Sequence, residues 1–138
     1  MIKLNMVLGN GTMLAGIWKG VKEVAPEKMP TMIGVEMVGG DPVYQAIEQG
    51  VDFVELAQAP DSLAKAISAK AAFSSPKAVR AIVESGGEVV RITEEELLQE
   101  IEVVKGLGQV TPGVAAVSTF AALRRWGGGG VVVCLMSG

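Results

Sequence analysis

Short apolar runs alternate with helical patterns along this chain, and the alternation constrains its fold more than any other feature. Runs typical of strands occur at residues 2–8, 31–37, 88–92 and 131–136. Between them, apolar residues recur at helical spacing, as in residues 14–24. Strands that alternate with helices pair in parallel through right-handed crossovers. We therefore expect residues 1–138 to form a single α/β domain of three layers, with a mostly parallel sheet of four to five strands and helices on both faces.

Capping residues and prolines mark where the helices begin. Ser, Thr and Asp side chains accept hydrogen bonds from the first free amides of a helix, and proline fits its first turn. The expected N-caps are Thr12, Asp41, Ser75 and Thr93, with Glu96 completing a capping box at the last of these. We also expect a short Ala-rich helix at residues 61–70 and a further helix at residues 111–126.

The last strand-like run, Val131 to Met136, contains Cys134 as its only polar residue. Continuously apolar strands are typical of sheets covered by helices on both faces, so we expect this strand to be buried. A thiol on a buried strand behaves as a small apolar side chain. We therefore interpret Cys134 as a core residue and not as a nucleophile.

Composition excludes several classes of function. The chain has no histidine and one cysteine, which rules out His-based triads, His or Cys metal centres and an internal disulfide. A net charge of −3 gives no electrostatic basis for binding nucleic acid. The longest apolar run is too short to cross a membrane, and the N-terminus shows no secretory pattern, so we expect a cytoplasmic protein.

The segment Gly9-Asn10-Gly11-Thr12 lies between the first predicted strand and the first predicted helix. Glycine allows a sharp turn and leaves backbone amides uncovered, and the helix start adds free N–H groups and a positive dipole end. Together these features favour an anion site, most often for phosphate. The spacing matches neither the Walker A loop nor the GxGxxG fingerprint. Taken alone, a tight turn without a ligand explains the segment equally well.

The motifs of this chain, in their order, resemble threonine synthase, a member of the β-family (fold type II) of pyridoxal-phosphate enzymes. Gly9-Asn10-Gly11-Thr12 and residues 14–20 are similar to the phosphate loop and the helix that follows it. Further similar segments are residues 32–36, 61–67, 84–97, 111–118 and 131–138, the last resembling the final strand and its Thr-Gly. The resemblance therefore covers nearly the whole chain in the right order.

The resemblance implies roles for individual residues. Gly9, Asn10, Gly11 and Thr12 would hold the phosphate of pyridoxal phosphate, and Asn10 is the side chain most expected to do more than support the fold. Ser137 would face the pyridine nitrogen, where a neutral hydroxyl suits elimination and replacement reactions of amino acids. Two positions depart from the family: Thr111 stands where a Glu is usual, and Thr12 where the commonest loop has Gly.

The family's Schiff-base lysine lies upstream of the phosphate loop in a Ser-x-Lys-x-Arg context. None of the eight lysines of this chain stands in that context. The upstream asparagine and the smaller, substrate-closing domain of the family also have no counterpart here. The chain thus resembles only the C-terminal portion of such an enzyme, so we assign no catalytic residue and no metal ligand and expect no activity from it alone.

Two hypotheses about function remain open. In the first, the chain is the cofactor-phosphate portion of a threonine-synthase-like lyase of amino-acid biosynthesis, and catalysis needs a partner chain that carries the lysine. In the second, it is a non-catalytic, stand-alone domain that binds a small phosphate-bearing ligand or another protein. An apolar sheet edge left uncovered would favour a homo-oligomer or a complex with a separate N-terminal chain.

Overall fold

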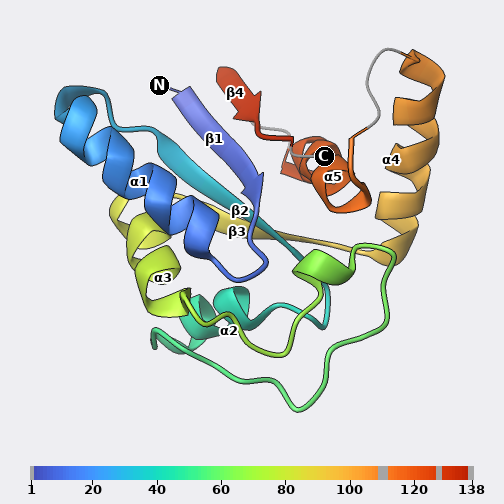
Figure 1. Cartoon of the computed structure of the whole chain (residues 1–138), viewed down its shortest axis with the longest axis horizontal. Coiled ribbons are helices and arrows are strands. Elements are labelled where there is room, and N and C mark those ends of the chain that lie inside the picture. The colour runs from blue at the N-terminus through green and yellow to red at the C-terminus, as the bar shows by residue number, and fades with distance from the viewer. Residues whose placement is uncertain (1, 109–111, 127–128, 137–138) are drawn as a thin grey trace.

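The computed structural model describes residues 2–108, 112–126 and 129–136 of the chain. Within these residues, one sheet contains four strands in the order β3-β2-β1-β4 (Figure 1). The strands are β1 (Ile2–Val7), β2 (Thr31–Met37), β3 (Glu88–Ile92) and β4 (Val131–Cys134). All three pairings are parallel, with Asn5 opposite Ile33 of β2 on one side and Cys134 of β4 on the other.

Helices cover both faces of the sheet (Figure 1), which confirms the predicted three-layer α/β fold. The helices α1 (Thr12–Val24), α2 (Pro42–Gln49) and α3 (Ser75–Glu84) lie on one face. On the other face lie α4 (Glu94–Leu107) and α5 (Val114–Trp126). Two short 3-10 turns, η1 (Pro26–Lys28) and η2 (Lys65–Ile67), complete the described elements. No described helix is both long enough and apolar enough to span a membrane.

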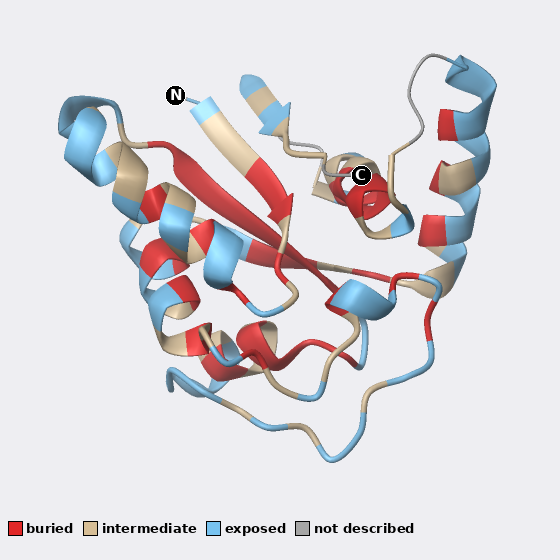
Figure 2. Cartoon of the chain, viewed as in Figure 1, coloured by how far each residue is buried: buried red, intermediate tan, exposed pale blue. Residues whose placement is uncertain are grey.

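The core consists of two clusters, one on each side of the sheet. Neighbouring residues of a strand point to opposite faces, so Met32 of β2 joins Leu14 and Trp18 of α1 in one cluster. Ile33 and Val35 of the same strand enter the other cluster, with the α4 and α5 side chains. The central strand β2 is buried along its whole length (Figure 2). This is why its sequence is almost continuously apolar.

The order of the strands reverses at β1. The chain runs from β1 outward to β2 and β3 through α1, α2 and α3, and then returns across the other face to pair β4 with the free side of β1. The connections that leave and enter this pair of strands therefore lie on opposite faces. In open α/β sheets, ligands bind in the crevice at the carboxyl ends of such a pair. The turn after β1 lies at that position.

Three sequence-based expectations about elements were wrong. Residues 61–70 form only the short turn η2. Ser62 Oγ accepts the Ala64 amide at 3.0 Å, but the Ser62 hydroxyl and the Leu63 amide also donate to the Glu94 carboxylate at 2.6 and 2.9 Å, which ties this segment to the start of α4. Thr12 and Ser75 do not cap their helices but begin them, and the N-caps are Gly11 and Ser74. The predicted start at Thr111 lies outside the described residues.

The last strand was also expected to be buried, and this too was wrong. β4 is an edge strand with β1 as its neighbour on one side only, and it is no more than half-buried. Val131 is 61 % exposed and Val133 is 41 % exposed. The apolar sequence of β4 therefore does not mean that the strand is buried, because its valines are exposed in this structure.

The start of α4 has the predicted capping box, whereas α2 is capped from a distance. Glu96 and Thr93 exchange hydrogen bonds between side chain and backbone, as the spacing indicated. At α2, Asp41 is the N-cap but makes no capping bond with its side chain. Instead, the Glu36 carboxylate at the end of β2 accepts the amides of Tyr44 at 2.8 Å and Val43 at 3.2 Å.

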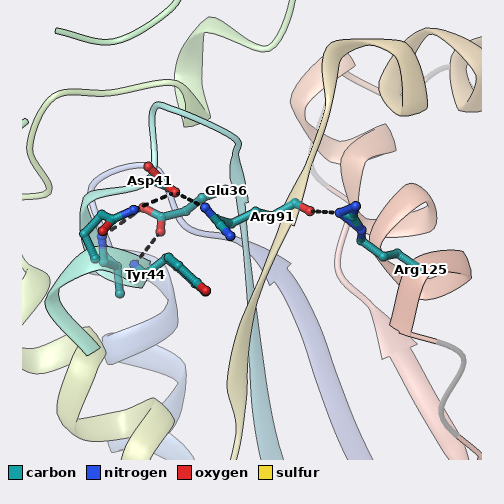
Figure 3. Close-up of polar contacts among 7 residues, drawn as sticks. Glu36, Asp41, Tyr44, Arg91 and Arg125 are labelled. Atoms are coloured by element: carbon teal, nitrogen blue, oxygen red, sulfur yellow. Dashed lines mark hydrogen bonds and ion pairs between the residues drawn. The ribbon is translucent and has the colours of Figure 1, made fainter. Parts of the chain in front are cut away.

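A network of charged groups surrounds Glu36 (Figure 3). Asp41, whose side chain is almost fully buried, accepts a hydrogen bond from Arg91 of β3 at 3.1 Å. The Arg91 guanidinium stacks on the Tyr44 ring, 3.8 Å from its centroid. Burial raises the pKa of the Glu36 carboxyl to about 8, the amides of Tyr44 and Val43 oppose the rise, and the Asp41 carboxylate adds to it.

The Glu36 carboxyl should therefore make stability depend on pH. Its folded-state pKa lies above the unfolded value, so its contribution is full below about pH 4.5 and is lost as pH rises through about 8. Across that window the free energy of unfolding should fall by on the order of 4 kcal/mol relative to Glu36→Gln, which cannot titrate. Urea unfolding at several pH values measures the difference. Glu23→Gln, at an exposed site, is the control, and parallel pH curves for wild type and Glu36→Gln would contradict the assignment.

Candidate functional site

The segment Gly9-Asn10-Gly11-Thr12 forms the turn between β1 and α1. Gly9 and Gly11 have positive φ angles of 47° and 83°. The Gly11 amide donates to Leu8 O at 2.6 Å, which closes the turn, and the first bond of the helix runs from the Ala15 amide to Gly11 O at 3.1 Å. The amides of the three helical residues before Ala15 therefore have no partner within α1. They form the amino-terminal, positive end of this helix.

Packing against η2 and α3 favours glycine at both positions. A Cβ at Gly9 would lie 2.9 Å from Ala66 O, and one at Gly11 would lie 3.1 Å from Ala78 Cβ. Both residues also adopt backbone angles that L side chains rarely take. Contacts within the protein thus leave no room for a side chain at Gly9 or Gly11.

Asn10 ties this turn to the start of α3. Its side-chain oxygen accepts the Phe73 amide at 2.7 Å, and its backbone carbonyl accepts the Ser74 amide at 3.0 Å. Its side-chain amide donates to Thr12 Oγ1 at 3.4 Å. Asn10 therefore acts as a latch: it fixes the turn to a segment that lies 63 residues further along the sequence.

The hydroxyl groups of Thr12 and Ser74 lie 2.9 Å apart. This bond brings the first residue of α1 next to the N-cap of α3, so the starts of two helices lie side by side. Phe73 and Ser74 were missed by the sequence analysis. The only signal for them was the Ser-Pro pair at residues 75–76, which marks a helix start and says nothing about its neighbour.

The charge around the turn suits an anion. The first turn of α1 contains no acidic residue, and a carboxylate there would repel a phosphate. The described residues also contain no group of three or more His, Cys, Asp or Glu placed to hold a metal ion. Free amides, a helix dipole and the crevice at the reversal of strand order together fit a phosphate group.

The segment that follows β4 is held against β1. β4 pairs with β1 in register, and the Leu135 amide donates to Asn5 O at 2.9 Å. Ser137, the residue expected to face a pyridine nitrogen, lies outside the described residues, as does Thr111. The four residues of the glycine turn are thus the part of the candidate site that the structure describes.

Cys134 belongs to a small polar cluster between β1, β4 and α5. The Asn5 side-chain amide donates to Thr119 O at 2.8 Å and to Cys134 Sγ at 3.6 Å. Desolvation raises the pKa of the Cys134 thiol, against the hydrogen bonds from Thr119 and Asn5. A raised pKa disfavours the thiolate, so this cysteine is poorly suited to act as a nucleophile.

The comparisons with known proteins agree with this geometry. The family model of pyridoxal-phosphate dependent enzymes matches residues 4–138. Threonine synthase of Methanosarcina acetivorans is 30 % identical over 149 residues, covering 99 % of this chain and 36 % of that protein. The chain thus spans about a third of the length of such a relative.

Solved structures share the fold at low sequence identity. A threonine deaminase from T.th. superposes with a TM-score of 0.74 at 22 % identity, over 91 % of this chain and 43 % of that one. Threonine synthase from Escherichia coli superposes with a TM-score of 0.73 at 16 % identity, over 95 % of this chain and 30 % of that one. Because the family model covers nearly every residue, including the glycine-lined turn, the chain belongs to the family of pyridoxal-phosphate-dependent enzymes.

Proposed function

We propose that this chain is the cofactor-phosphate-binding portion of a threonine-synthase-like lyase. The observation that carries the proposal is the turn at Gly9 to Thr12, which places the first amides of α1, without partners in that helix, at the carboxyl end of β1. Gly9, Asn10, Gly11 and Thr12 would hold the phosphate of pyridoxal phosphate, and Ser137 would face its ring nitrogen. When bound, the cofactor supplies an electron sink for elimination and replacement reactions of amino acids.

The residues of the turn act by binding and orientation. Amides that point at one anion contribute on the order of 1–3 kcal/mol each, less the cost of ordering the ligand. The turn is already ordered by the Asn10 latch, so little is lost in shaping it. With backbone groups as the main contacts, we expect affinities in the millimolar to high-micromolar range for phosphate or free pyridoxal phosphate, roughly −4 to −6 kcal/mol.

Catalysis is proposed to require a Schiff-base lysine from outside these 138 residues, for example from a partner chain. The eight lysines of this sequence lack the Ser-x-Lys-x-Arg context that the resemblance leads one to expect, and the curated relatives are about three times as long. The alternative function is a non-catalytic phosphate-binding domain. One observation favours it: contacts within the protein shape the turn, so it can bind phosphate without any reaction.

Phosphate titration followed by amide NMR tests the binding proposal. Shifts should concentrate at residues 9–14. Asn10→Asp keeps an oxygen to accept the Phe73 amide but adds a negative charge beside the free amides. We expect it to fold normally and to bind phosphate at least tenfold more weakly, on the order of 1.4 kcal/mol. Gln58→Glu adds the same charge at an exposed, distant loop and should bind as wild type. Shifts only at residues 127–130, or unchanged binding by Asn10→Asp, would overturn the assignment.

The purified chain with added pyridoxal phosphate should show no threonine synthase, dehydratase or cysteine synthase turnover. The reason is that no lysine is available in the family context to bind the cofactor covalently. Phosphate release reports the synthase reaction, ammonia and 2-oxo acid release report the dehydratase reaction, and formation of cysteine reports the cysteine synthase reaction. Measurable turnover that persists after repeated purification would contradict the requirement for a lysine from outside these residues.

The β4 edge should make the chain associate. Val131 and Val133 are exposed on this strand, and an apolar edge strand pairs readily with another chain. Sedimentation velocity at micromolar concentration should show a dimer or higher oligomer. Val133→Lys should shift the protein toward monomer, whereas Val103→Lys, at a similarly exposed position of α4, should not. A clean monomer for the wild-type chain would count against this proposal.

A further inference from the structure

A groove runs along the outer surface between α1 and α3, away from the carboxyl ends of the strands. The two helices pack side by side over the sheet (Figure 1). The groove has a volume of about 500 Å³ and is open to solvent. It begins at the Thr12 and Ser74 hydroxyls and extends to Lys22 and Glu84. The cofactor-phosphate proposal uses none of its charged side chains.

The groove is strongly positive in an acidic protein. Four cationic side chains and one carboxylate line it, a net charge of +3 where the whole chain has −3; the cations are Lys19, Lys22, Lys77 and Arg80, and the carboxylate is Glu84. Like charges that converge on one concave surface repel one another unless an anion lies between them. A third of the chain's twelve cationic side chains line this groove, so their mutual repulsion favours the binding of an anion.

The carboxylate of the groove is already neutralised. Glu84 accepts hydrogen bonds from Lys22 at 2.9 Å and from Trp18 Nε1 at 3.3 Å, and the bond from Lys22 lowers the pKa of Glu84. In the part of the chain that the structure describes, neither Lys77 nor Arg80 has an ion-pair partner within 4.0 Å. The charge of Arg80 also lowers the pKa of Glu84, and Lys19 pairs with Glu23 at 3.9 Å. Both side chains of the Lys19–Glu23 pair are exposed, so a ligand can compete for Lys19.

The spacing of the cations indicates what kind of anion fits. Lys19 and Lys22 are three residues apart on α1, and Lys77 and Arg80 are three residues apart on α3, so each pair lies on one helix face. Positive charge is therefore spread along nearly one turn of both walls. A single phosphate can contact only part of this strip, whereas linked phosphates can contact it along its length.

The floor and one end of the groove suit the same ligand. Gly16 lies on the floor, and a Cβ added there would meet no heavy atom within 4 Å, so the backbone of α1 stays bare at this point. Glycine inside a helix costs about 0.5–1 kcal/mol relative to alanine. At the end of the groove, the Thr12 and Ser74 hydroxyls lie 2.9 Å apart at the positive starts of both helices.

We propose that the groove between α1 and α3 binds a small molecule that carries two or more linked phosphate groups. Lys77, Arg80 and Lys19 contact the phosphates from both walls, and the Thr12 and Ser74 hydroxyls donate to the terminal one. The bare backbone at Gly16 lets the ligand lie close to α1. The site shares Thr12 with the glycine turn, but its cations lie along the groove between α1 and α3, so it does not require the chain to bind pyridoxal phosphate.

Calorimetric titration of the whole chain with inorganic triphosphate, at constant ionic strength, tests the proposal. Triphosphate should bind at least tenfold more tightly than monophosphate. Lys77→Ala combined with Arg80→Ala should weaken triphosphate binding at least tenfold. Lys28→Ala with Lys105→Ala is the matched control, because it removes the same charge from exposed sites outside the groove and should change binding less than twofold. Trp18 fluorescence in a Trp126→Phe background gives a second readout from the groove wall.

Each other result would overturn the proposal. Equal weakening by the control pair would show a general charge effect, and unchanged binding by the groove pair would place the ligand elsewhere. Amide shifts confined to residues 9–14 would show that triphosphate uses the glycine turn alone. A hexaglutamate peptide that binds as tightly as triphosphate would make the groove a site for acidic peptides.

A second variant tests the groove without changing its charge. Gly16→Leu, which places a bulky side chain in the groove while keeping every cation, should lose triphosphate binding and retain a helical circular dichroism spectrum.

Discussion

Parallel pairing of β1 with strands on both of its sides is the constraint on which the rest of this structure depends. Parallel neighbours need a crossover, and a right-handed crossover places its helix on one face. Because the chain leaves β1 toward β2 and later returns to β4 on the other side, the two crossovers must use opposite faces. The carboxyl end of β1 is therefore left open between them, and Gly9 to Thr12 occupy that opening.

The two edge strands of the sheet, β3 and β4, differ in how far other parts of the chain cover them. At β3, Arg125 of α5 donates to Arg91 O at 3.0 Å (Figure 3), so the backbone of that edge has a partner in the same chain. At β4, Val131 and Val133 are exposed, and the Asn5 side-chain oxygen behind this strand is buried without a partner among the described residues. Edges that are not blocked tend to pair with another chain.

α1 uses its backbone and its side chains for two different tasks. Its first amides face the carboxyl end of β1, where a cofactor phosphate is proposed to bind, while Lys19 and Lys22 line the outer groove against Lys77 and Arg80 of α3. Asn10 and Thr12 couple the tasks, since their bonds to Phe73 and Ser74 fix α1 relative to α3. Amides act on an anion over short range, whereas exposed cations act over about a Debye length, ~10 Å at 0.1 M salt.

Interactions between close neighbours in sequence could be predicted from the sequence, and those between distant segments could not. The bounds of β2 and β3, the start of α2, the Thr93–Glu96 capping box and the glycine turn follow from periodicity, proline and residues three positions apart. The capping of α2 by Glu36, the Asn10 latch and the cations of the groove need segments brought together by packing. The edge position of β4 likewise follows from strand order, because an apolar run reads the same at the centre of a sheet and at its edge. The sequence by itself determined most of the elements that form, since local hydrogen bonds and side-chain period decide them. The tertiary structure decided which of them meet, and at residues 61–70, where Ser62 and Leu63 bond to Glu94, it left only the turn η2 in place of the expected helix.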